Sequence, residues 1–294
     1  EDAMKSLLVM APFWDPFCPP LGIASLQAFL RHKGHDVAIC DYNTDAFIWR
    51  AYLSYFEVFQ TIVPESREWN IKRVGPDYMS RHQMAWLFLR EQAQRYMDLS
   101  RLILNIDGRQ QLEPTSFEPL DRIFEAIYAR IDEITDAKLS EHQPDLIGCT
   151  LLTTTLPASL HILRRAKQQN PKVRTVLGGP GPIMGAGADS PDTNRIIEKC
   201  PWIDNIVIGE GELLLDALLR NALPGRKVLS LRDISSLDAT IPLGKTTRQG
   251  LISDLSTLPT PDYSGLAVNT YSKLSVGVSR GCAYQCSFCY ETTY

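Results

Sequence analysis

The first forty residues alternate between short apolar runs and one amphipathic stretch. Ser6–Met10 is a continuous apolar run of the kind that a parallel strand shows when both faces are covered. After a proline-rich loop, apolar residues recur with helical period over Leu21–Arg31, and Gly34 follows where that helix should end. Asp36–Asp41 is the next expected strand. The pattern predicts a βαβ unit.

A second series of strand and helix patterns begins after Pro144. Short apolar runs predict three strands, at Asp145–Cys149, Val173–Leu177 and Ile206–Ile208. Helical patterns lie between and after these runs, over Leu156–Gln169, near Asp192–Lys199 and from Glu212 onward. This alternation predicts an α/β fold with a doubly wound parallel, Rossmann-like sheet.

The stretch from about 43 to 142 interrupts the alternation and is too long for an ordinary connection. It has helical periodicity and many aromatic residues, which we expect to be core rather than a ligand box: Trp49, Tyr52, Tyr55, Phe56, Phe59, Trp86, Phe88 and Tyr96. We therefore expect a Rossmann-like domain over 1–222 with a helical insertion. A connector with little secondary structure, rich in Pro, Thr, Ser and Gly, should follow over 223–269.

Composition narrows the function classes. A net charge of -4 gives no basic surface for nucleic acid, and no apolar run approaches the length of a membrane span. Seven cysteines in 294 residues are too few for a disulfide framework, and no signal peptide precedes them. We expect a cytoplasmic protein without a nucleic-acid or membrane partner.

Three of the cysteines form the most specific motif of the chain. Cys282, Cys286 and Cys289 stand in a C-x3-C-x2-C run. Three thiolates at this spacing suit three irons of a [4Fe-4S] cluster, which leaves the fourth iron open to a substrate or cosubstrate. Structural zinc is the alternative, but zinc prefers four ligands, usually in two separated pairs. The other cysteines are dispersed and expected to be structural: Cys18, Cys40, Cys149 and Cys200.

Ligands of an open α/β sheet lie beyond the carboxyl ends of its strands, and the expected loops there are distinctive. They span Pro16–Leu21, Thr150–Thr155, Gly178–Pro182 and Gly209–Glu212. Glycines let the backbone approach a large planar ligand, and threonine hydroxyls offer donors and acceptors. The Gly-x-Gly-x-x-Gly fingerprint of dinucleotide sites is missing after the first strand.

In their order and spacing, these stretches resemble the cobalamin (B12)-dependent radical S-adenosylmethionine (SAM) enzymes. Six stretches match: Pro19–Ala24, Gly34–Val37, Pro144–Gly148, Gly178–Pro180, Gly209–Glu212 and the linker-like Leu255–Asp262. The strand-like run Lys273–Ser279 would be the first strand of the radical SAM (β/α) barrel, which begins near 270 and runs to 294 with the cluster loop. Flavodoxin-like tight turns are the alternative explanation for the glycine loops.

The resemblance implies three cofactors: a [4Fe-4S] cluster on Cys282, Cys286 and Cys289, SAM on its open iron, and cobalamin. Phe288 and Tyr290 would shelter the cluster or contact SAM, with packing an equal alternative. The implied cobalamin contacts are Pro20, Leu21, Thr150, Leu151, Leu152, Thr153, Gly178, Gly179, Pro180, Gly209, Glu210 and Gly211. No histidine stands in the Asp-x-His-x-x-Gly pattern that supplies the lower cobalt ligand in many B12 proteins, so none is expected from that motif.

The implied function is methyl transfer to an unactivated carbon or phosphorus, through a 5′-deoxyadenosyl radical and methylcobalamin. The partners would be a small-molecule or peptide substrate and an electron donor such as flavodoxin or ferredoxin. Because one barrel strand cannot enclose a substrate, we expect this chain alone not to turn over. The alternatives are a cyclase or rearrangement enzyme with both cofactors, and a non-catalytic corrinoid or Fe-S module. A methylthiotransferase is disfavoured, because the dispersed cysteines cannot form a second cluster site.

Overall fold

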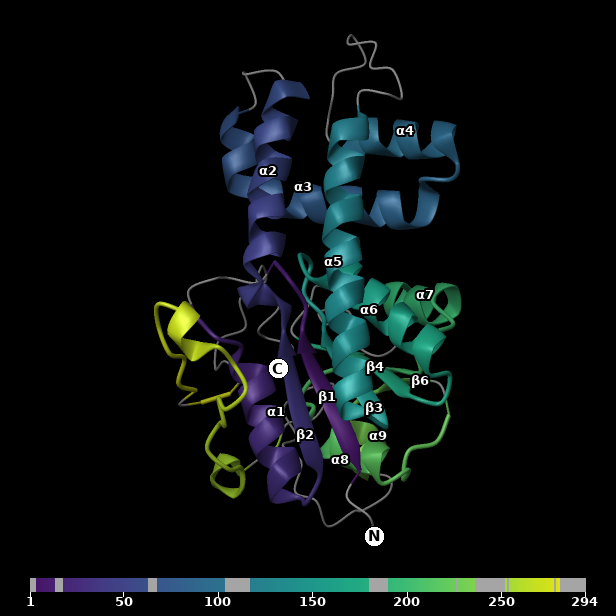
Figure 1. The fold of residues 1–294 in the computed structure, drawn as a ribbon. Coiled ribbons are helices and arrows are strands. Elements are labelled where there is room, and N and C mark those ends of the chain that lie inside the picture. Colours follow the sequence, from purple (N-terminus) through teal and green to yellow (C-terminus); the bar gives the residue numbers. More distant parts are fainter. Residues whose placement is uncertain are drawn as a thin grey trace.

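The computed structural model contains one parallel sheet (Figure 1). It describes residues 4–13, 18–62, 68–103, 117–179, 190–225, 227–235, 252, 254–277 and 279–280. The strands are β1 Lys5–Met10, β2 Asp36–Asp41, β3 Leu146–Thr150, β4 Arg174–Gly178, β5 Asn205–Val207 and β6 Lys227–Leu229. Their order is β2-β1-β3-β4-β5-β6, and every pairing is parallel. The expected doubly wound α/β fold is confirmed, with its topological switch point between β1 and β3.

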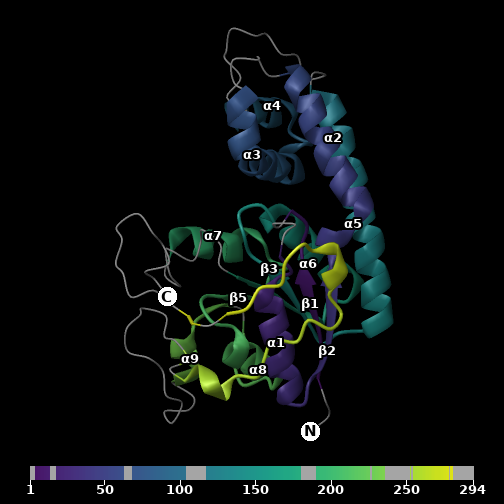
Figure 2. The same ribbon diagram turned by 90° about the vertical axis from the view of Figure 1, so that its left-hand side faces the viewer.

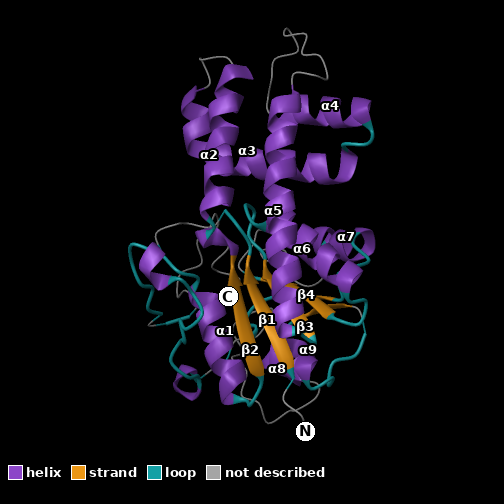
Figure 3. Cartoon of the chain, in the orientation of Figure 1, coloured by secondary structure: helices purple, strands orange, loops and turns teal. Residues whose placement is uncertain are grey.

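Each face of the sheet is covered by its own set of helices (Figure 3). Helices α1 Leu21–His32, α8 Glu212–Leu219 and α9 Leu231–Ser235 pack on one face. Helices α5 Glu118–His142, α6 Leu156–Gln169 and α7 Pro191–Lys199 pack on the other. Along β1, Leu7 and Val9 join the core under α5 and α6, whereas Leu8 and Met10 join the core under α1 and α8. This alternation explains why β1 is apolar throughout.

The expected helical insertion forms a bundle above the carboxyl edge of the sheet (Figures 1 and 2). After the 3-10 turn Tyr42–Thr44 it comprises α2 Ala46–Ile62, α3 Glu68–Leu89, α4 Ala93–Ile103 and the first part of α5. Its core is aromatic, as predicted: Tyr55 stacks on Phe124 at 5.3 Å and Trp86 on Tyr128 at 5.4 Å between ring centroids. Of the eight aromatic residues expected in the core, Tyr55, Phe59, Trp86 and Tyr96 are buried, Trp49, Tyr52 and Phe56 are half-buried, and Phe88 is 41% exposed.

The described part of the expected connector, 223–269, contains the short strand β6 and the short helix α9, and β6 extends the sheet beyond residue 222. One expectation about secondary structure was wrong. The run Lys273–Ser279 forms no strand over its described residues. A strand needs a neighbour for its backbone hydrogen bonds, and no described strand pairs with this run.

Residues 254–280, which we call the strap, are docked on the sheet domain (Figure 2). The strap contains the 3-10 turns Leu255–Thr257 and Val268–Thr270. Gln27 on α1 donates from Nε2 to the carbonyl oxygens of Asp262 and Ser264, at 3.0 and 2.7 Å. Leu266 is buried in the core under α1. These contacts fix the strap against α1.

Candidate functional site

The carboxyl edge of the sheet brings together most of the residues expected to contact cobalamin. Pro20 caps α1 and Leu21 begins it, after β1. Thr150 ends β3 and 151–153 follow it, Gly178 ends β4 and Gly179 follows it, and Gly209–Gly211 follow β5. Because all strands are parallel, these loops share one edge, at and beside the switch point. Pro180 lies outside the described residues.

Side-chain hydrogen bonds order the loop between β3 and α6. Thr155 is fully buried. Its Oγ1 accepts a hydrogen bond from the Leu152 amide at 3.1 Å and donates one to the Thr150 carbonyl oxygen at 3.2 Å. Ser159 donates to the same carbonyl at 2.6 Å. The Thr150 hydroxyl accepts from the Ala11 amide at 3.4 Å, which ties this loop to β1 across the switch point. The half-buried side chains of Thr150 and Thr153 therefore stand on a rigid loop.

The loops after β3 and β4 touch through their backbones. The Leu151 amide donates to the Gly178 carbonyl at 2.7 Å. Gly179 has φ +141°, and a Cβ there would lie 3.0 Å from both the nitrogen and the oxygen of Leu151. Such contacts are too close for a side chain, so this position requires glycine.

The loop after β5 holds two buried carboxylates, Glu210 and Glu212. Arg280 donates from Nη1 to Glu210 Oε1 at 3.0 Å and from Nη2 to Glu212 Oε1. The second oxygen of Glu210 accepts from the Ile252 amide at 2.6 Å. Burial alone would lower the pKa of Arg280, but the bonds to Glu212 and Glu210 outweigh it and raise the pKa. The Glu210 carboxylate is thus engaged within the chain through both of its oxygens.

Sequence reasoning did not single out Arg280 as a residue of this edge. The available signal was the Glu-x-Glu spacing at a strand end together with an arginine two residues before Cys282. The residues expected to bind the cluster and SAM, which are Cys282, Cys286, Cys289, Phe288 and Tyr290, lie outside the described residues.

All five histidines are described, and they lie away from the carboxyl-edge loops. His35 is paired with Asp216 at 2.8 Å, and His161 with Asp132 at 2.8 Å. His82 is fully buried in the insertion, where burial lowers its pKa to about 3. His32 and His142 lie in the last turns of α1 and α5, at the opposite edge.

The dispersed cysteines have the environments of structural residues. Cys40, Cys149 and Cys200 are buried and Cys18 is half-buried. Burial raises the pKa of Cys40 to about 12 and raises that of Cys149 as well, so both stay protonated thiols, which are poor metal ligands. Within the described ranges, no three His, Cys, Asp or Glu side chains converge as a metal site.

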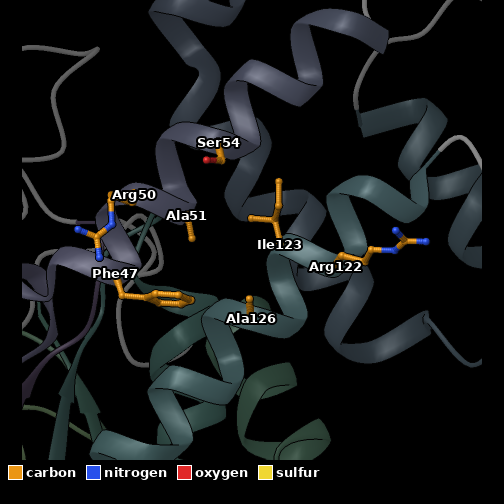
Figure 4. Close-up of a pocket in the computed structure, with 7 residues that line it drawn as sticks. All are labelled: Phe47, Arg50, Ala51, Ser54, Arg122, Ile123 and Ala126. Carbon is orange, nitrogen blue, oxygen red and sulfur yellow. The ribbon is translucent and has the colours of Figure 1, made fainter.

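An open groove of about 320 Å³ lies on the insertion, between α2 and α5 (Figure 4). Seven residues line it: Phe47, Arg50, Ala51, Ser54, Arg122, Ile123 and Ala126. None of them is among the expected cobalamin contacts, so the groove is separate from the carboxyl-edge site. Over the part of the chain that the structure describes, no helix combines the length and apolarity that a bilayer span requires.

Residues 123–219 match the B12 binding domain family. The match begins inside α5, so the end of the expected insertion already belongs to the matched region. It also includes β3, β4 and β5, whose carboxyl ends form three of the four site loops.

Three curated proteins are similar to part of the chain. An anaerobic magnesium-protoporphyrin IX monomethyl ester cyclase from Rubrivivax gelatinosus is 31% identical over 52% of this chain and 28% of its own length. An uncharacterized methyltransferase from Pyrococcus horikoshii is 30% identical over 51% of this chain and 32% of its own length. A Cereibacter sphaeroides protein with the same cyclase name is 29% identical over 55% of this chain and 28% of its own length. The matched part of this chain thus spans about a third of each relative or less.

Among solved structures, UDP-GlcNAc 2-epimerase from Neisseria meningitidis aligns over 77% of this chain and 45% of its own, with 15% identity and a TM-score of 0.29.

Proposed function

We propose that this chain supplies the cobalamin-binding and cluster-binding parts of a B12-dependent radical SAM methyltransferase. The observation that supports this most is the placement of the expected cobalamin contacts on loops of one carboxyl edge, within and beside the region that matches the B12 binding domain. The C-x3-C-x2-C run follows that domain in the sequence.

Two features of the described edge support a large planar ligand such as a corrin. Glycines stand in the loops after β4 and β5, and the described histidines lie away from these loops. In this proposal, Thr150 and Thr153 offer hydroxyls to the ligand, and Gly178 and Gly179 let the backbone approach it. When bound, cobalamin would carry the methyl group to be transferred.

The cysteine segment fits a [4Fe-4S] cluster by its donor chemistry. Cys282, Cys286 and Cys289 would hold three irons, and the fourth would bind SAM. Phe288 and Tyr290 would exclude water beside them. When a flavodoxin or ferredoxin reduces the cluster, the cluster and SAM together would supply a 5′-deoxyadenosyl radical. This radical would take a hydrogen atom from an unactivated carbon or a phosphorus centre. The substrate would be a small molecule or a peptide. Such chemistry needs a reducing compartment such as the cytoplasm.

A cyclase or rearrangement reaction is the second candidate, because two of the relatives are named as cyclases. SAM labelled in its methyl group separates the two, with a protein that includes this chain. Methyl transfer predicts label in the product, together with 5′-deoxyadenosine, whereas cyclisation predicts 5′-deoxyadenosine and an unlabelled product. Failure to release any 5′-deoxyadenosine under reducing conditions would contradict both and favour a corrinoid or Fe-S sensor.

A further inference from the structure

Arg280 links the start of the cysteine segment to the loop after β5. It lies two residues before Cys282, and its side chain is only 31% exposed. The two carboxylates that it contacts, on Glu210 and Glu212, are 6% and 5% exposed. Glu210 also holds the Ile252 amide, so three separate segments meet at one point. We call the three side chains Glu210, Glu212 and Arg280 the clamp.

The clamp depends on the shape of the guanidinium group. Its two terminal nitrogens each donate to a different carboxylate, and a planar fork spans both at once. A lysine ammonium keeps the charge but is a single point on a flexible stem, so it cannot reproduce this geometry. Without a cation, two buried carboxylates would lie side by side uncompensated, which folded proteins avoid.

We infer that Arg280 is a positioning residue that sets where the cluster lies relative to the corrin. The inference rests on the proposed function, since it needs both groups. Gly209 and Gly211 are expected to border the corrin, and they flank Glu210. Arg280 stands only two residues before Cys282 in the sequence, so in this proposal its anchorage to the loop would limit how far the cysteines can lie from the corrin.

Arg280→Lys tests the inference, with Arg31→Lys as the matched control. Arg31 also anchors the strap through an ion pair, 2.6 Å from Asp262, but this pair involves neither Glu210 nor Glu212. Both variants are reconstituted with iron and sulfide and loaded with cob(II)alamin. The readout is the electron-spin relaxation of the reduced cluster with and without the paramagnetic cobalt, because this enhancement falls steeply with distance.

We expect Arg280→Lys to keep its iron and to bind hydroxocobalamin within about threefold of the wild type, yet to lose at least about half of the relaxation enhancement. Arg31→Lys should retain all of it. Adding Glu212→Gln to Arg280→Lys should lower the relaxation enhancement little further, because the effects of two residues in one contact are not additive.

Equal relaxation enhancement in Arg280→Lys and the wild type, with both groups bound, would overturn the inference and leave the proposed function intact. Loss of iron from Arg280→Lys would also overturn it, because Arg280 would then be needed to assemble the cluster. Failure of the wild type to bind iron or cobalamin would contradict the proposed function. The wild-type protein alone makes this test, so the two failures can be told apart.

Discussion

Tyr271 donates a 2.7 Å hydrogen bond to the Asp41 carboxylate, although 230 residues separate them in the sequence. Asp41 ends β2, and Tyr271 lies in the strap. Burial raises the pKa of Asp41, and the bond from Tyr271 partly offsets this rise. The bond therefore favours the ionised carboxylate and fixes the strap to the carboxyl edge of the sheet.

Tyr271→Phe should lower the free energy of unfolding by about 2 kcal/mol at neutral pH, the usual cost of a hydrogen bond to a charged group. The bond lowers the folded-state pKa of Asp41, so its contribution is present above that pKa and is lost as the pH falls through it. Urea unfolding at neutral and acidic pH measures both effects.

Tyr263→Phe is the matched control. Its hydroxyl donates to the neutral Ser275 carbonyl, also in the strap. The cost of this substitution should not depend on the ionisation of Asp41. An equal pH dependence for the two variants would contradict the role of the Asp41 charge.

Much of the sheet domain could be predicted from sequence, because its elements have clear periods. The bounds of β2 and α6 agree with their patterns, since apolar residues alternate or recur there without interruption. The strand β6 could not be predicted, because it has three residues and is a strand through its pairing with β5. The run Lys273–Ser279 has a strand pattern, but the pattern alone supplies no pairing partner.

Only part of the candidate site could likewise be predicted from the sequence. The loop glycines follow predicted strands, so their shared edge could be inferred from the parallel topology. The contacts of Arg280 and Tyr271 could not, because each joins segments whose approach depends on the path of the strap.

Gly179→Ala should destabilise the protein by about 2 kcal/mol, because φ +141° is strained for any side chain and the new Cβ would press on Leu151. Moving Leu151 displaces the β3–α6 loop, so we also expect hydroxocobalamin to bind about tenfold more weakly. Urea unfolding and spectroscopic titration measure the two effects.

Gly225→Ala is the control for Gly179→Ala. Gly225 has φ +87° but open space around its Cβ position, and it precedes β6 at the opposite edge. Gly225→Ala should lower the free energy of unfolding by about 1 kcal/mol without changing the affinity for cobalamin. Equal affinities for the two variants would remove the loop after β4 from the site.

His82 should make the insertion sensitive to acid. Its Nε2 lies 2.8 Å from the Tyr96 hydroxyl, which donates to Asp121, and its Nδ1 lies 3.0 Å from the Tyr55 hydroxyl. The neutral tautomer protonated at Nε2 satisfies this chain. Burial lowers its pKa to about 3, so its stabilising contribution is present above the unfolded pKa near 6.5 and is lost as the pH falls below it.

Between pH 7 and 5 this loss should amount to about 2 kcal/mol of unfolding free energy. His82→Gln removes the titration, so its unfolding free energy should change less over this range. Urea unfolding at both pH values makes the comparison. A pH dependence equal to that of the wild type would show that other groups cause the acid sensitivity.

Replacing Cys282, Cys286 or Cys289 by Ala should abolish the cluster, because each thiolate is expected to bind one iron. The wild type reconstituted under anaerobic conditions should hold about four irons per chain. Cys18→Ala is the control, since Cys18 is half-buried and far from the motif in sequence. Iron retained in all three variants would refute the cluster assignment.

Cobalamin binding tests the central claim most directly. The anaerobically purified protein is titrated with hydroxocobalamin, and bound cobalt and iron are measured together with the visible spectrum. We predict about one cobalt per chain together with the iron of the cluster. Iron without any capacity to bind cobalamin would contradict the claim that the carboxyl edge of this sheet is a corrinoid site.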